Sequence, residues 1–174
     1  MADERITTRP ATRAFTDTWQ FKIMRSLVGA ANPLIKRLLG SRFARPLAGS
    51  LLLLRYKGRR SGRTYTTPVG YAREGDRIVV VTSPAYSWWR SMVGGADVGV
   101  RLDGGWRRAR ALLTNPTDPG YDDAVALQVA KRGPGMLRGF GVQVTDDGRV
   151  PADARAIAST RAHIVRIDLD SGSR

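Results

Sequence analysis

Residues 51–71 read LLLLRYKGRRSGRTYTTPVGY, two apolar segments separated by a basic turn. Leu51–Lys57 is a continuous apolar run that becomes polar at its end. After the GRRSG turn, Arg63–Ala72 alternates between two faces. The residues on one of these faces are Tyr65, Thr67, Val69 and Tyr71. A period of two is typical of a half-buried β-strand, so this region predicts two strands joined by a tight turn.

Further strand signals follow downstream. Arg77–Ser83 is a short buried strand that follows a turn at Glu74-Gly75-Asp76. Asp97–Leu102 and Trp106–Leu113 flank Asp103-Gly104-Gly105, a strong hairpin signal. A last strand is expected at Ala162–Leu169.

One helix is expected between these strands. It is capped by Thr117-Asp118-Pro119, runs to about Lys131 and is ended by Gly133-Pro134-Gly135, and a loop then leads to the last strand. Hairpin-connected strands with helices at the edges predict an α+β fold built on an antiparallel barrel.

The N-terminal part differs from the rest. Residues 1–17 form a polar arm without the apolar middle of a secretory signal. Residues 18–31 and 32–39 have the apolar spacing of two short basic helices, which can pack on the sheet or lie on a membrane surface. We expect a single domain over residues 18–170, with a helical part at 18–50 and a tail at 171–174.

Charge is the strongest compositional signal. The net charge is +14, and the 55 residues from Trp19 to Arg73 contain twelve Lys or Arg and no Asp or Glu. Such a region attracts anions, so nucleic acid, anionic lipid and a phosphorylated cofactor are all candidates. The chain has no cysteine and one histidine, which argues against a metal site and suits a reducing cytoplasm.

Two segments are candidates for a binding site. In Lys57–Arg63, two glycines frame a turn whose amides can point at one anion, although charged turns are also common as plain solvated turns. In Ser83–Arg90, adjacent tryptophans point to different sides of a helix, so one can pack inward while the other lies along a planar ligand. Ser83 can offer a hydroxyl to that ligand or cap the helix.

Taken together, these segments resemble the deazaflavin-dependent nitroreductase family. The matching text is LLLLRYKGRRSGRTYTTPVGY, then RIVVVTS, then SWWRSMVGGADVGVRLDG, over roughly residues 51–113. The resemblance implies a split antiparallel β-barrel of the FMN-binding kind with N-terminal and edge helices. It also implies the deazaflavin coenzyme F420, whose phosphate and oligoglutamate tail would account for the acid-free basic region.

The resemblance also assigns residues. Those similar to the family's phosphate and tail contacts are Lys57, Arg59, Arg60, Ser61 and Arg63. Those similar to its ring contacts are Thr67, Pro68, Val69, Ser83 and Trp88 or Trp89. The chain departs from many relatives in the short SPAYSWW loop and in having Ser91 where Asn is frequent.

The implied reaction is a hydride transfer to a small organic acceptor such as a quinone or nitro compound. The catalytic residues stay unknown, because no Ser-His-Asp set or carboxylate pair is visible, and His163 is expected to be a core residue. Candidates for the substrate side are Tyr86, Tyr121, Gln128 and Arg138. The alternatives are an FMN or haem binder on the same barrel, a membrane-surface protein that docks through the N-terminal helices, and a nucleic-acid-binding protein, which lacks a reader motif. Barrels of this class often form homodimers.

Overall fold

The computed structural model describes residues 51–170, and the expected arm, N-terminal helices and tail lie outside them. The strands are β1 Leu51–Lys57, β2 Thr64–Gly70, β3 Ala72–Glu74, β4 Arg77–Thr82, β5 Ala96–Leu102, β6 Gly105–Thr114 and β7 His163–Leu169. The helices are η3 Trp88–Met92, α4 Tyr121–Arg132, α5 Gly135–Gly139, η4 Ala152–Ala154 and α6 Arg155–Arg161. None of these helices is long and apolar enough to cross a membrane.

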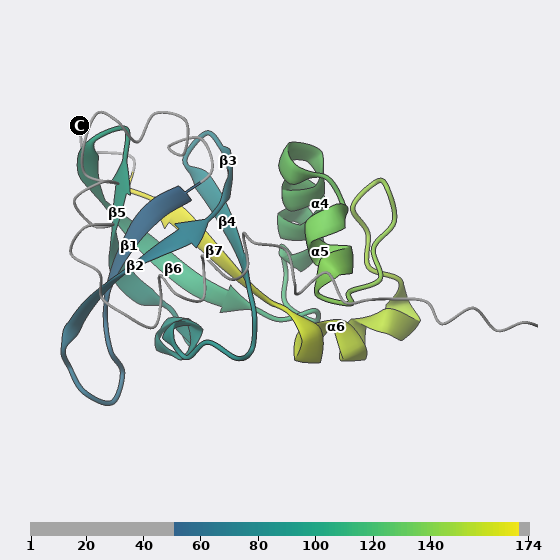
Figure 1. Cartoon of the computed structure of the whole chain (residues 1–174), viewed down its shortest axis with the longest axis horizontal. Coiled ribbons are helices and arrows are strands. Elements are labelled where there is room, and N and C mark those ends of the chain that lie inside the picture. The colour runs from purple at the N-terminus through teal and green to yellow at the C-terminus, as the bar shows by residue number, and fades with distance from the viewer. Residues whose placement is uncertain (1–50, 171–174) are drawn as a thin grey trace, which may run out of the picture.

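All seven strands belong to one antiparallel sheet in the order β2-β1-β5-β6-β7-β4-β3. β2 and β3 stand at its opposite edges, although only Tyr71 separates them in the chain. The sheet therefore has to curl until its edges meet, and β2 does contact β4 (Figure 1). The result is a half-barrel, consistent with a split barrel.

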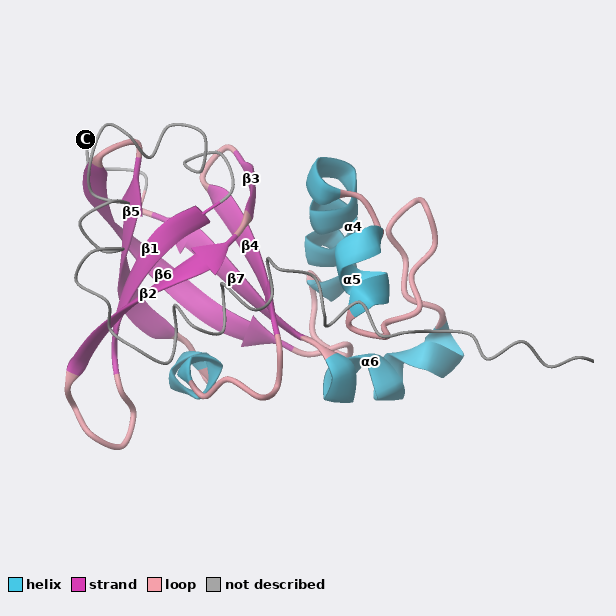
Figure 2. Cartoon of the chain, viewed as in Figure 1, coloured by secondary structure: helices cyan, strands magenta, loops and turns pink. Residues whose placement is uncertain are grey.

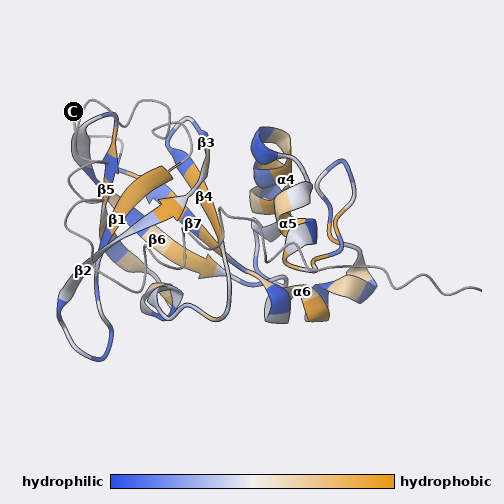
Figure 3. Cartoon of the chain, viewed as in Figure 1, coloured by the Kyte–Doolittle hydropathy of each residue, from blue (hydrophilic) through white to orange (hydrophobic). Residues whose placement is uncertain are grey.

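The curled sheet buries apolar residues on both faces. Inside the curl, residues of every strand except β3, such as Leu52, Leu54, Val100 and Ile167, form one core. Val79 and Ile164 point to the other face and pack with helical residues into a second core. Figure 2 shows α4, α5 and α6 gathered on this second side, next to β3 and β4. Apolar residues mark β1 and β4 in Figure 3, whereas the turn between β1 and β2 is hydrophilic.

The expected strand at Arg63–Ala72 was wrong in one respect, because it is interrupted at Tyr71. Residues 64–70 pair with β1, whose first residue, Leu51, lies opposite Gly70. Beyond that point β1 offers no partner, and Ala72 pairs with Val79 of β4 instead. Arg132 of α4 stabilises the point at which the chain passes from β2 to β3, because its Nε and Nη2 donate to the Tyr71 carbonyl at 3.0 and 2.8 Å.

Two expectations about the helices were also wrong. The loop expected after Gly135 contains α5, η4 and α6, whose few residues give too little periodicity to be recognised. The cap of α4 is Gly120, with a φ of 82°, and the helix begins at Tyr121. Asp118 does not cap it, because its carboxylate accepts from the backbone and side-chain nitrogens of Asn115.

We expect Gly148→Ala to destabilise the protein more than Gly75→Ala. Both glycines have positive φ, 81° and 59°, which costs an alanine about 1–2 kcal/mol. At Gly148 a β-carbon would also lie 2.6 Å from the Cα of Ala126 in α4, whereas at Gly75 it meets nothing within 4 Å. Overpacking should add about 1–3 kcal/mol at Gly148 alone. Urea denaturation of both variants measures the difference, and equal losses would show that the loop does not press on α4.

Candidate active site

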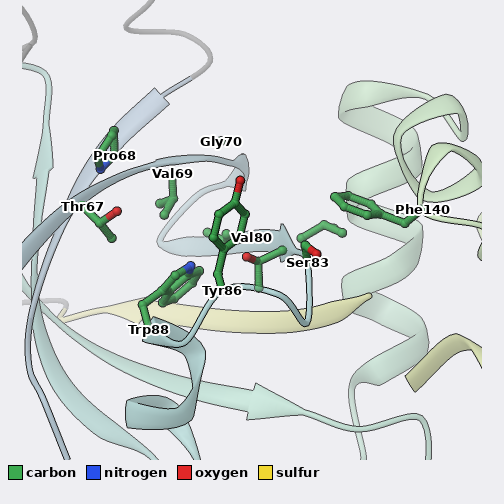
Figure 4. Close-up of a pocket in the computed structure, with 11 residues that line it drawn as sticks. Thr67, Pro68, Val69, Gly70, Val80, Ser83, Tyr86, Trp88 and Phe140 are labelled. Carbon is green, nitrogen blue, oxygen red and sulfur yellow. The ribbon is translucent and has the colours of Figure 1, made fainter. Parts of the chain in front are cut away.

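A cleft lies at the seam where β2 approaches β4 (Figure 4). It holds about 420 Å³ of empty space, part of which is open to solvent. Its described lining residues are Thr67, Pro68, Val69, Gly70, Val80, Val81, Thr82, Ser83, Tyr86, Trp88 and Phe140. None of these side chains carries a charge, so the cleft suits an apolar, uncharged group.

The two strands present free edges to the cleft. β2 is the first strand of the sheet and pairs only with β1 among the described strands. β3 pairs with β4 no further than Val79, so the edge of Val80–Thr82 has no described strand beside it. Unpaired backbone N–H and C=O groups require hydrogen-bond partners. A planar ligand with donors and acceptors on its rim can therefore bind both edges.

The adjacent tryptophans of η3 point to different sides. Trp88 is buried and lines the cleft. Trp89 does not line the cleft, and its ring centroid lies 3.9 Å from that of His163. The Trp89 indole nitrogen is buried without a hydrogen-bond partner in the described part of the chain. Of the two tryptophans expected at the ring site, Trp88 lines the cleft and Trp89 does not.

His163 lies behind Trp89 rather than in the cleft. It is half-buried at the start of β7, opposite Thr82 in the register of β4. Burial lowers the pKa of its imidazole, and the nearby charge of Arg90 lowers it further. The neutral ring is therefore the favoured form in the folded protein.

Ser83 lies directly after β4 and lines the cleft. Its Oγ accepts from the Ala85 N–H at 3.2 Å, and its carbonyl accepts from the Tyr86 N–H. The residue therefore caps the turn that leads to Tyr86, and its hydroxyl hydrogen is left to donate elsewhere. The two interpretations of Ser83, as a cap and as a ligand contact, are compatible.

The basic turn between β1 and β2 is folded tightly. Gly58 N–H donates to the Arg63 carbonyl, and Gly62, with a φ of 63°, donates to the Gly58 carbonyl, each at 2.8 Å. Arg59 N–H donates to Ser91 Oγ, and Arg63 N–H donates to Ser61 Oγ. Within the described residues, the amides of Arg60 and Ser61 alone in this turn have no acceptor. Fewer amides than the sequence suggested can therefore serve an anion.

The cations of this turn are exposed and do not line the cleft. They are Lys57, Arg59, Arg60 and Arg63. None of them forms a salt bridge with an acidic residue between positions 51 and 170. Their charge is therefore left for an anion from outside this part of the chain.

A row of aromatic rings leads from the turn to the cleft. The Tyr65 hydroxyl lies 3.1 Å from Ser61 Oγ, and its ring stacks on Tyr56 with centroids 5.7 Å apart. Tyr56 in turn lies 6.5 Å from Trp88. Burial raises the pKa of the Tyr56 hydroxyl, and Tyr65 raises it further, so Tyr56 stays neutral. A row of neighbouring rings thus connects the turn with the cleft.

The residues expected on the substrate side lie in different parts of the structure. Tyr86 lines the cleft. Tyr121 and Gln128 are buried within the helical layer, and Arg138 donates to the Val144 carbonyl. Phe140 was missed, although an aromatic residue between two glycines in an expected loop is a recognisable signal.

The family model for the F420H(2)-dependent quinone reductases matches residues 31–131, more than half of the chain. The chain belongs to this family. Membership makes the protein an F420-dependent oxidoreductase and confirms the cofactor that the resemblance implied. A comparison with curated proteins finds no match.

Several solved structures are similar to the chain at low identity. One is an F420-H2 dependent reductase, FDR-A, at 16% identity, with 68% of this chain and 94% of that chain covered and a TM-score of 0.43. Another is the haem storage protein HutZ of Vibrio cholerae, at 14% identity, 81% and 91% coverage and a TM-score of 0.44. A third is an FMN-binding protein of Nostoc punctiforme related to pyridoxamine 5'-phosphate oxidase, at 12% identity, 79% coverage of both chains and a TM-score of 0.44. At these TM-scores, no ligand or activity of these proteins is transferred to the chain.

We expect His163 to make stability depend on pH. It is the single histidine of the chain, and its pKa is lower in the folded than in the unfolded state. The unfolded chain therefore takes up a proton first as the pH falls, and stability is lost from the unfolded pKa, about 6.5, down to the folded pKa.

Urea denaturation between about pH 7.5 and pH 5 measures this loss, where carboxylates contribute little. The control is His163→Asn, which should flatten the dependence in this range. A wild-type slope equal to that of His163→Asn would contradict the burial of a neutral imidazole.

Proposed function

We propose that the protein reduces quinones with reduced F420, with the ring of the cofactor in the cleft and its phosphate and tail at the basic turn. The observation that carries this proposal is the row of aromatic rings that connects an uncharged cleft with an exposed cluster of cations. A deazaflavin has the same division into a flat ring system and a polyanionic tail.

The ring end of the site fits a deazaflavin. Thr67, Pro68 and Val69 supply the free edge of β2, and Val80–Thr82 supplies the edge of β4. The pyrimidine part of a deazaflavin carries carbonyls and an N–H, which match the donors and acceptors of a strand edge. Trp88 adds a planar apolar wall. Trp89 lies in the same short helix and packs against His163 instead.

The tail end also fits. Lys57, Arg59, Arg60 and Arg63 provide exposed cations without described acidic partners, and Ser61 lies among them. The free amides of Arg60 and Ser61 can donate to a phosphate oxygen together with these side chains. An oligoglutamate tail can use several of the cations at once, whereas a single phosphate cannot.

The reduced cofactor supplies the hydride when it is bound, and the protein supplies position and environment. The apolar lining of the cleft excludes water from the reacting groups. Ser83 Oγ and the Tyr86 hydroxyl are the side-chain groups near the turn after β4 that can donate a hydrogen bond to an oxygen of the acceptor. His163 packs against Trp89 and is not among the described residues that line the cleft, so it is not assigned a role in moving protons.

Haem and FMN fit the described site less well. The single histidine of the chain packs against Trp89 outside the cleft, so it is not placed as an axial ligand there. FMN has one phosphate, which leaves most of the turn unused. Membrane contact through the helices expected at residues 18–39 and a homodimer are further proposals, and both concern features beyond the described residues.

The purified protein should bind F420 more tightly than FMN. Titration of each cofactor, followed by fluorescence, measures the two dissociation constants, and raising the salt concentration should narrow the difference because it screens the extra charges of the tail. Equal or tighter binding of FMN would exclude the tail as a source of affinity.

We expect the double variant Arg60→Ala/Arg63→Ala to weaken F420 binding by at least about tenfold. Each lost charge-assisted hydrogen bond contributes about 1.5–3 kcal/mol, and about 1.4 kcal/mol is a factor of ten in affinity. The matched control is Arg108→Ala/Arg161→Ala, which removes two exposed arginines outside the turn and the cleft. If both double variants lose affinity equally, net charge rather than the turn attracts the cofactor.

A further inference from the structure

Phe140 is the residue of the helical layer that reaches the cleft. The other described lining residues come from β2, from β4 and from the segment between β4 and η3 or η3 itself. Figure 4 shows Phe140 on the side of the cleft opposite Thr67 and Pro68. Among the described residues, the half-barrel therefore bounds the cleft on one side and the ring of Phe140 bounds it on the other.

The end of α5 fixes the position of this ring. Gly141 N–H donates to the Arg138 carbonyl at 2.9 Å, and Val142 N–H donates to the Leu137 carbonyl at 3.0 Å. Gly141 has a φ of 80°. These bonds and this conformation form a Schellman motif, in which Phe140 is the C-cap residue that follows Gly139, the last residue of α5.

Two further contacts anchor the motif. Leu137 and Val142 are both buried in the second core, which is the apolar contact that accompanies such a helix end. Arg138 donates through Nε and Nη2 to the Val144 carbonyl and through Nη2 to Asp146. Phe140 is thus carried on a braced backbone and forms a fixed wall rather than a movable cover.

We infer that Phe140 sets the size limit for the electron acceptor, an inference that rests on the proposed function. The half-barrel side provides the strand edges and Trp88 for the ring of the cofactor, which leaves the space toward Phe140 for the acceptor. Because no charged side chain lines this space among the described residues, the acceptor class is uncharged, flat quinones with small substituents.

The test compares two naphthoquinones that carry a methyl or a phenyl group on the same quinone carbon. In wild-type protein, kcat/KM should be lower for the phenyl compound. Phe140→Ala should raise the phenyl-to-methyl ratio of kcat/KM by at least about tenfold, and Phe140→Trp should lower it. The dissociation constant of F420 should stay within about twofold of wild type in both variants, since the wall faces the acceptor.

Two additional variants provide a milder substitution at Phe140 and a control outside the cleft. Phe140→Leu retains most of the packing and should raise the ratio by a smaller factor if the alanine variant loses its fold. Ile157→Ala is the matched control, because Ile157 lies in α6 of the same layer, is 56% exposed and does not line the cleft. It should leave the ratio unchanged.

The outcomes separate this inference from the proposed function. If wild-type protein fails to bind F420, the proposed function fails and the inference falls with it. If F420 binds but the ratio is unchanged in the Phe140 variants, the inference alone is wrong. A loss of F420 affinity of about tenfold or more in Phe140→Ala would place the ring against the cofactor and would also overturn the inference.

Discussion

The chain has one residue, Tyr71, in which to pass from the first to the last strand of a seven-stranded sheet. A flat sheet would separate β2 and β3 by the width of five strands, so the sheet has to curl. Curling brings the free edge of β2 toward the free half of β4, and the cleft is the gap that remains. Arg132 stabilises this arrangement by donating two hydrogen bonds to the Tyr71 carbonyl, which connects α4 to the residue between β2 and β3. The gap between the two strand edges therefore follows from the topology of the strands, and loop residues complete its lining.

The separation of charge from the cleft is the second feature of the site. Burying a cation in an apolar space costs desolvation free energy, and without an anionic partner no interaction offsets that cost. Here they stay on an exposed turn, and the Tyr65, Tyr56 and Trp88 rings bridge the distance to the cleft. A ligand that has both an apolar and an anionic part can use both ends, and its charged part then contributes affinity without placing charge beside the reacting atoms.

Much of the sheet could be predicted from the sequence, because strands and hairpins are specified by short-range patterns. The limits of β1 followed from its continuous apolar run, and the hairpins at Gly75 and Gly104 followed from their turn residues. The break at Tyr71 could not be predicted, since it depends on where β1 and β4 offer partners. The site divides in the same way: Thr67, Pro68, Val69, Ser83 and Trp88 do meet at one cleft, and the family model matches the resemblance that grouped them. Which tryptophan of η3 lines the cleft and where α5 places Phe140 could not be predicted, because both are decided by tertiary packing.

The arginines show why composition alone is a weak guide to function. Arg155 donates through Nη2 to both oxygens of the Asp122 carboxylate and through Nη1 to the Pro116 carbonyl. Arg132 and Arg138 each donate through Nε and Nη2 to one backbone carbonyl. Arg55 lies 3.8 Å above the ring of Trp106. These arginines stabilise the fold, because a planar guanidinium with several N–H donors can bind several acceptors at once. The functional signal in the charge is its placement: the cations of the turn have no described acidic partners and lie at the end of an aromatic row that begins in the cleft.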